Sequence, residues 1–152
     1  MSALDVIISV RGLPIAQGNA KAFVVGKRAV IATGVKQSTP LGAWRSSIAT
    51  EARAIMGTDT TWTVPVAVTI GFRMPRPKSH FRANGLLKLD APDWHTSKPD
   101  IDKLTRAVLD ALTHVVIAND SQVGRLKVTK VYAPVGANVG ADITVSDLAL
   151  WR

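Results

Sequence analysis

The amino-acid sequence predicts an α+β fold, in which two helices pack on a mixed sheet of about five strands. Short stretches that alternate apolar and polar residues are typical of half-buried strands. Two longer segments have apolar residues at three- and four-residue spacing, which is typical of amphipathic helices. The length of 152 residues suits one globular domain, and no repeat, heptad run or interdomain linker divides it. We therefore expect residues 1–152 to form a single domain.

Two strand-forming regions are predicted in the first part of the chain. Residues 4–10 alternate apolar and polar side chains and are followed by Gly12, which predicts a first strand. Residues 22–33 contain two apolar triplets that flank Gly26 and Lys27, and this pattern predicts a short hairpin with a basic turn.

The first helix is predicted over residues 40–56. Thr39 suits the N-cap, Pro40 suits the first turn and Gly57 suits the position after the last turn. Apolar side chains at helical spacing predict the face that packs on the sheet. These side chains are Leu41, Trp44, Ile48, Ala52 and Ile55.

A further strand and a long loop are predicted next. Residues 64–74 alternate, with valine, isoleucine and phenylalanine on one face. Residues 75–97 are rich in proline, glycine and basic side chains. A loop of this length is either functional or disordered.

The second helix is predicted from Asp100 to about His114. Residues 123–132 and 141–145 alternate again and predict the last strands. The helix has an apolar stripe that we expect to be buried. The stripe consists of Ile101, Leu104, Val108, Ala111, Leu112 and Val115.

Charge is unevenly distributed along the chain. Lys and Arg number 19 against 11 Asp and Glu, and the net charge of +8 favours polyanionic partners such as nucleic acid. Six of the acids lie between residues 90 and 120. Such an acidic segment would repel phosphate, and a bound divalent cation would remove that contradiction.

Composition also excludes several classes of protein and site. The absence of cysteine excludes disulfides, zinc–thiolate sites and cysteine nucleophiles, and it suits a reducing cytoplasm. No stretch approaches the roughly 18 consecutive apolar residues of a membrane span. We therefore expect a cytoplasmic protein with no membrane partner.

Three aspartates are the candidate metal ligands. Asp100 and Asp102 open the second helix two residues apart, and Asp120 stands at the start of the next strand. We expect the three carboxylates to converge on one point. Magnesium prefers oxygen ligands and usually keeps water and substrate oxygens, so two or three carboxylates suffice to bind it. In phosphodiester cleavage such an ion generates hydroxide and stabilises the leaving oxygen. We predict a Mg²⁺ site at which Mn²⁺ can substitute.

Arg106 is the candidate catalytic cation. It lies one turn after Asp102, on the same face of the helix and away from the apolar stripe. Its guanidinium can contact a scissile phosphate and offset the charge that develops in the transition state. A pKa above about 12 makes it a poor proton donor or acceptor, so we predict a purely electrostatic role.

The segment from Lys98 to Val123 resembles the signature of the RusA family of Holliday junction resolvases. The resemblance lies in Lys-Pro-Asp-Ile-Asp-Lys-Leu from Lys98, then Arg106, then Asp-Ala-Leu-Thr from Asp110 and Asn-Asp-Ser-Gln-Val from Asn119. It implies a RusA-like fold and a homodimeric, magnesium-dependent endodeoxyribonuclease. Such enzymes nick four-way DNA junctions on opposing strands in recombination and repair, and they are often phage-encoded.

The same resemblance assigns roles to four residues. It puts Asp100, Asp102 and Asp120 at the family's metal-binding positions. It puts Arg106 at a catalytic position that usually holds lysine. An arginine there keeps the positive charge but cannot shuttle a proton.

Two neighbouring positions also depart from the family pattern. Lys103 stands where the family usually has asparagine, and Asn119 replaces the first of two adjacent acids. Both changes reduce the local negative charge. They motivate an alternative function, a non-catalytic basic module that binds branched DNA around a degenerate metal site.

Other residues near the acidic segment allow two interpretations each. Asp100 is also a good helix N-cap, Asp110 faces the site or pairs with Arg106, and Trp94 is a candidate for stacking on DNA bases. The basic side chains are either a solvated surface or phosphate contacts. The predicted DNA contacts are Arg73, Arg76, Lys78, Arg82, Lys98 and Lys103.

Overall fold

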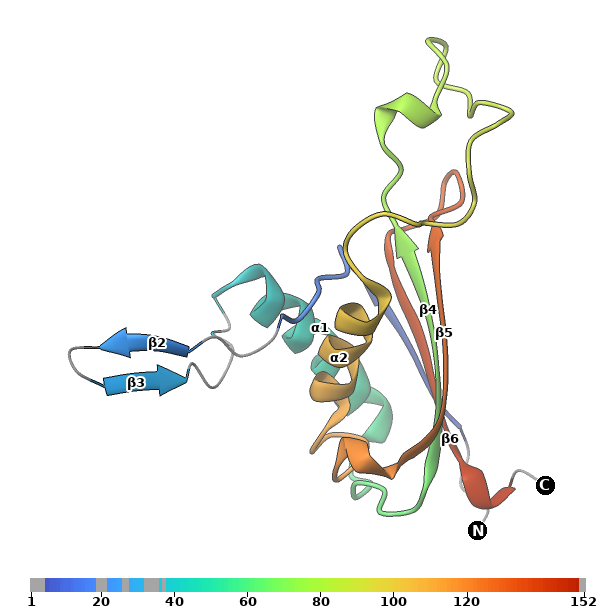
Figure 1. The fold of residues 1–152 in the computed structure, drawn as a ribbon. Coiled ribbons are helices and arrows are strands. Elements are labelled where there is room, and N and C mark those ends of the chain that lie inside the picture. The colour runs from blue at the N-terminus through green and yellow to red at the C-terminus, as the bar shows by residue number, and fades with distance from the viewer. Residues whose placement is uncertain (1–4, 19–21, 26–27, 32–35, 37, 151–152) are drawn as a thin grey trace.

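A four-stranded sheet forms the centre of the computed structural model, which describes residues 5–18, 22–25, 28–31, 36 and 38–150 (Figure 1). The strands follow the order β1-β6-β4-β5. β4 and β5 are parallel, whereas β6 pairs antiparallel with both β1 and β4, so the sheet is mixed as expected. The strands are β1 (Val6–Arg11), β4 (Val66–Met74), β5 (Val123–Tyr132) and β6 (Gly140–Asp147).

Both helices, α1 (Pro40–Met56) and α2 (Ile101–Leu112), cover the same face of this sheet (Figure 1). α1 begins where the sequence predicts, because the Thr39 hydroxyl accepts a hydrogen bond from the Gly42 N–H at 3.1 Å. It ends at Gly57, whose φ of 56° suits glycine. The predicted α+β class, with two helices on a mixed sheet, is confirmed.

Alternate residues of the strands build the core. In β4 the side chains of Val66, Val68, Ile70, Phe72 and Met74 face the helices and are buried. The next residues face the other way, where no helix of the described chain covers the sheet, and Thr69 is exposed there. The sheet therefore has one apolar face and one face open to solvent.

Two predictions of buried helix residues are wrong. Ile55 is 47% exposed and Met56 is buried instead, because the contact surface of α1 follows the inclined ridge of residues four apart. Ile101 is 40% exposed because it lines an open groove. Val115 packs against the core, but it lies beyond the end of α2.

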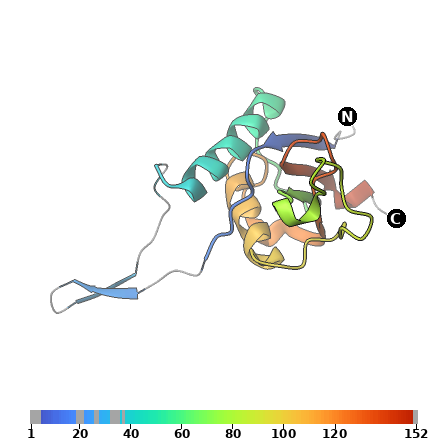
Figure 2. The ribbon, with the colours of Figure 1, turned by 90° about the horizontal axis from the view of Figure 1, so that it is seen from above.

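The main sheet has four strands rather than about five, and the predicted hairpin forms a separate sheet. β2 (Ala22–Val25) pairs antiparallel with β3 (Arg28–Ile31), and this pair forms its own two-stranded sheet. Figures 1 and 2 show it projecting away from the helices and the main sheet. The basic turn predicted at Gly26 and Lys27 lies outside the described residues.

α2 forms the crossover between the parallel strands β4 and β5, and this connection positions the candidate site. Because the two strands point the same way, α2 must run back along the sheet in the opposite direction. Its N-terminus therefore lies where β4 and β5 end, and its C-terminus lies where β5 begins (Figure 1).

The long loop between β4 and α2 is folded and attached to the sheet. Arg76 holds its base, since the guanidinium donates hydrogen bonds to the carbonyls of Pro92 at 2.7 Å and Ala133 at 3.2 Å. The same group lies over the ring of Tyr132, 5.3 Å from its centroid.

Within the part of the chain described, no helix is long and apolar enough to cross a membrane.

Candidate active site

Asp100 occupies the N-cap position of α2 but does not use its side chain as a cap. Its backbone is extended, its carbonyl accepts the first helical bond from the Leu104 N–H at 3.1 Å, and its carboxylate makes no capping hydrogen bond. One carboxylate oxygen lies 3.9 Å from the Lys103 ammonium, on a half-exposed surface. The purely structural interpretation of Asp100 therefore does not apply, and the carboxylate is turned outward.

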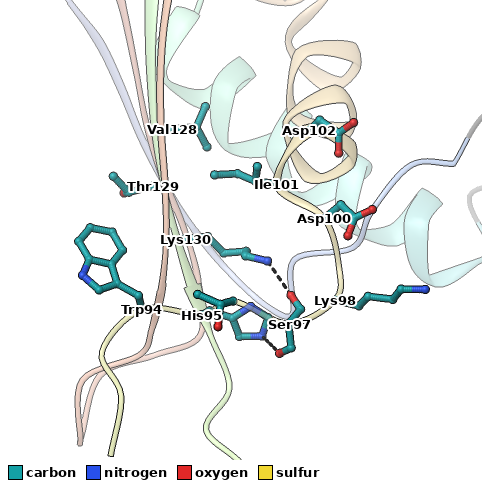
Figure 3. A pocket seen from close by; sticks show the side chains of 11 residues that line it. Trp94, His95, Ser97, Lys98, Asp100, Ile101, Asp102, Val128, Thr129 and Lys130 are labelled. Atoms are coloured by element: carbon teal, nitrogen blue, oxygen red, sulfur yellow. Dashed lines mark hydrogen bonds between the residues drawn. The ribbon is translucent and has the colours of Figure 1, made fainter.

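Asp100 and Asp102 line a cleft of about 770 Å³ between the start of α2 and the end of β5 (Figure 3). Lys98 and Lys130 contribute positive charge to the same cleft. Figure 3 shows the two aspartates on the helix side of β5, whereas Trp94 projects from the other side of the strand. Trp94 is 61% exposed and borders the cleft without facing the carboxylates.

A second groove, of about 360 Å³, continues along α2 beside β5. Ile101 and Asp102 at the start of the helix border both this groove and the cleft, as does Val128 of β5. The exposed Leu126 and the partly buried Val128 of β5 form the other wall. The polar lining residues are Asp102, Thr105, Arg106, Asp110 and Asp120.

A tight turn places Asp120 at the far end of this groove. The Asn119 side chain accepts a hydrogen bond from the Ser121 N–H at 2.9 Å, and the Gln122 side chain accepts one from the Asn119 N–H at 2.8 Å. Gln122 also donates to the carbonyl oxygens of Trp62 and Val64. Asn119 therefore acts as a cap that fixes the turn in which Asp120 is exposed.

The structure does not bring the three aspartates to one point. Within the described residues, no three acidic or histidine side chains lie close enough to hold a metal ion together. The crossover explains the separation, because Asp102 lies in the first turn of α2 and Asp120 lies beyond its last turn. At a rise of about 1.5 Å per residue, the helix axis spans roughly 15 Å between Asp102 and the last residue of α2.

The pair formed by Asp100 and Asp102 nevertheless fits a hard divalent cation. Both side chains are exposed and offer only oxygen donors in one cleft. Magnesium is commonly held by one or two carboxylates, with water and substrate phosphate completing its coordination. Within one chain, this pair is the part of the predicted ligand set that lies together.

A model of the endodeoxyribonuclease RusA family matches residues 12–145, which include both helices, β4, β5 and the residues that line the cleft and the groove. The chain belongs to this family. It is also 36% identical over 83 residues to the uncharacterized protein YqaN of Bacillus subtilis (strain 168). That match covers 49% of this chain and 54% of YqaN, so the chain spans about half the length of this curated relative.

In this RusA-family chain, Asp110 has a partner that the sequence pattern does not indicate. The Gln17 side-chain amide donates to the Asp110 carboxylate, and the Gln17 N–H donates to the Lys103 carbonyl at 3.0 Å. Asp110 thus holds the segment after β1 against α2. Arg106 is exposed and lines the groove between Asp102 and Asp110, so its predicted electrostatic role stays a prediction.

The predicted DNA contacts fall into three groups. Lys78, Arg82 and Lys98 are exposed, and Lys98 borders the cleft. Arg73 pairs with the Asp142 carboxylate, and Arg76 holds the base of the long loop. Arg73 and Arg76 are therefore committed to intramolecular partners. Lys103 lies next to Asp100 and is not part of the exposed group.

Lys130 and His95 also line the cleft, and the sequence pattern does not indicate a role for either. Lys130 lies in the alternating strand β5, where a lysine usually indicates the solvent face, yet it is partly buried and borders the cleft. His95 is 8% exposed. Burial and the neighbouring positive charge of Lys130 both lower the pKa of His95.

Proposed function

We propose that this RusA-family chain is a divalent-metal-dependent endodeoxyribonuclease that resolves four-way DNA junctions. The observation that supports this proposal is the pair of carboxylates, Asp100 and Asp102, at the start of α2. Both side chains are exposed, and the Asp100 carboxylate makes no capping bond. Both residues line the cleft beside β5.

The positions of the other residues suggest which of them bind DNA phosphate and which stabilise charge during cleavage. Lys98 at the rim of the cleft can bind a DNA phosphate, and Arg106 can stabilise negative charge on the phosphate during cleavage. Asp100 and Asp102 would hold Mg²⁺ or Mn²⁺, which supplies activated water at the scissile phosphate when bound. The exposed Lys78 and Arg82 would extend the cationic surface along the loop.

A homodimer is part of the proposal, for two reasons. A four-way junction has approximate two-fold symmetry, and paired nicks require two sites. In addition, Asp120 lies beyond the end of α2 and, among the described residues, forms no three-residue metal-binding group with Asp100 and Asp102 of the same chain. Two copies related by a two-fold axis present these groups in opposite order, so a dimer allows Asp120 of the partner subunit to complete the pair.

The test is cleavage of a synthetic four-way junction by the purified protein in Mg²⁺. We expect paired nicks by the wild type, and a loss of at least about 100-fold in rate for Asp102→Asn, as is typical when a metal ligand or its support is removed. A linear duplex of the same sequence is the control substrate. Equal nicking by Asp102→Asn, or no nicking by the wild type, contradicts the proposal.

The alternative is a non-catalytic module that binds branched DNA. The ion pair between Lys103 and Asp100 favours it, because a resident cation partly neutralises one of the two carboxylates. This alternative predicts junction binding that falls steeply with salt but is indifferent to Mg²⁺ and to Asp102→Asn. The junction assay, read for both binding and nicking, separates the two functions.

A further inference from the structure

The segment that leads into α2 is attached to the sheet by one side chain of β5. The Lys130 ammonium donates a hydrogen bond to the Ser97 carbonyl at 2.7 Å and another to the Pro99 carbonyl, also at 2.7 Å. Figure 3 shows the Lys130 side chain reaching from the strand to this segment. Asp100 follows Pro99 directly, so the second bond fixes the peptide from which the first carboxylate emerges.

We infer that Lys130 is a positioning residue that sets the orientation of Asp100 and Asp102 for binding a divalent cation. This inference deepens the proposed function and rests on it. Lys130 makes no ion pair within 4.0 Å with any described carboxylate, although it shares the cleft with both aspartates. Its charge is directed at the two carbonyl oxygens rather than at either carboxylate.

The local backbone explains why such an attachment is needed. Asp100 gives no side-chain cap to α2, so the helix start lacks the bond that usually fixes this position. The backbone bond between the His95 N–H and the Lys130 carbonyl, at 3.1 Å, attaches the loop five residues before Asp100. The Lys130 side chain extends this attachment from His95 to Pro99.

The neighbours of Lys130 support a fixed rather than a mobile ammonium. His95 packs edge-on against Tyr132, with ring centroids 4.8 Å apart, and its second ring nitrogen lies 3.5 Å from the Ser97 hydroxyl. The aliphatic part of Lys130 lies beside this group in the partly buried wall of the cleft. An ammonium held in this way donates two hydrogen bonds in a fixed geometry. Methionine has no N–H donor and cannot replace it.

The test measures Mn²⁺ affinity of the full chain by electron paramagnetic resonance, without DNA. We expect Lys130→Met to weaken Mn²⁺ binding by about 10- to 100-fold, the usual effect of removing a residue that orients metal ligands. Lys130→Arg retains both charge and donors, and should restore most of the affinity. Lys127→Met is the matched control, because it removes the same charge from an exposed position of the same strand.

Folding and activity are measured on the same variants. Thermal unfolding shows whether each is folded at the assay temperature, and Lys130→Gln, which keeps an N–H donor, replaces Lys130→Met if the latter is unfolded. Wild-type Mn²⁺ affinity in a folded Lys130→Met or Lys130→Gln overturns the inference while leaving junction cleavage by the wild type intact. Equal losses in Lys130→Met and Lys127→Met also overturn it, since they indicate a general charge effect. A wild type that neither binds Mn²⁺ nor nicks junctions overturns the proposed function and this inference together.

Discussion

Asp102 and Asp120 lie at opposite ends of α2, yet both line the one groove that runs between this helix and β5. The groove therefore has an acidic group at each end and the exposed Arg106 between them. This arrangement leads to a testable prediction about how two copies of the chain assemble. If the carboxylates act together, they must do so across two copies of the chain.

A mixture of two inactive variants tests that statement. Asp102→Asn and Asp120→Asn should each abolish junction nicking as homodimers. In a mixed dimer, one site would combine the intact Asp102 of one subunit with the partner's intact Asp120, so the mixture should nick one strand. Nicking assays before and after subunit exchange provide the measurement. A mixture that stays inactive after exchange, with mixed dimers demonstrated, would show that each subunit acts alone.

Helix capping separates the roles of two N-cap residues. Thr39→Ala removes a side-chain cap from α1 and should lower the free energy of unfolding by about 1 kcal/mol. Asp100→Ala removes no such bond, so it should cost only about 0.3 kcal/mol through the weakened interaction with the helix dipole. Urea unfolding of both variants is the measurement. A larger loss for Asp100→Ala would mean that its carboxylate stabilises the helix after all.

The base of the long loop depends on Arg76. Arg76→Ala removes the hydrogen bonds to two carbonyls, the ion pair with the exposed Asp93 and a cation–π contact, and should destabilise the chain by about 2 kcal/mol. It should also expose residues 75–97 to protease. Arg82→Ala, at an exposed position of the same loop, should change stability by less than about 0.5 kcal/mol. Similar protease sensitivity in both variants would contradict this role for Arg76.

Salt dependence of junction binding distinguishes DNA contacts from internal contacts. Lys98→Ala should reduce the slope of log affinity against log salt by about one, because it removes one phosphate contact. Arg73→Ala should leave the slope unchanged, since its guanidinium pairs with Asp142 and donates to the Asn138 carbonyl. Binding isotherms at several salt concentrations give both slopes. A reduced slope for Arg73→Ala would place that side chain on the DNA.

His95 should make stability fall under mildly acidic conditions. Its pKa is lowered in the folded protein by burial and by Lys130, so below the ordinary value of 6.5 the unfolded chain binds a proton that the folded chain does not. Stability is therefore lost as pH falls through 6.5 and stops falling below the folded pKa. The melting temperature at pH 7.5 and 5.5 should differ more for wild type than for His95→Asn. Equal differences would show that His95 titrates normally.

Much of the fold was predictable because local patterns dominate it. Alternation identified β4 and β5, and the Thr39 cap with Gly57 identified the ends of α1. The hairpin of β2 and β3 was also predicted, but its separation from the main sheet depends on tertiary packing that no local pattern records.

The site was less predictable than the fold. The sequence identified Asp100, Asp102 and Asp120, but their separation follows from the parallel pairing of β4 and β5, which places the start of β5 at the far end of α2. The role of Lys130 cannot be predicted from the sequence. A lysine in an alternating strand gives the same apolar–polar pattern whether its side chain faces solvent or donates to a backbone carbonyl. The position of Asp120 and the contacts of Lys130 both depend on how segments far apart in the sequence pack together.

The uncovered face of the sheet provides a practical attachment point. The chain contains no cysteine, so Thr69→Cys would create a single thiol in the middle of that face, on the side of β4 away from α1 and α2. A maleimide dye attached there would report encounters with labelled junctions by energy transfer while the groove stays unmodified. One-sided packing thus allows a fluorescent probe to be introduced without rebuilding the hydrophobic interior.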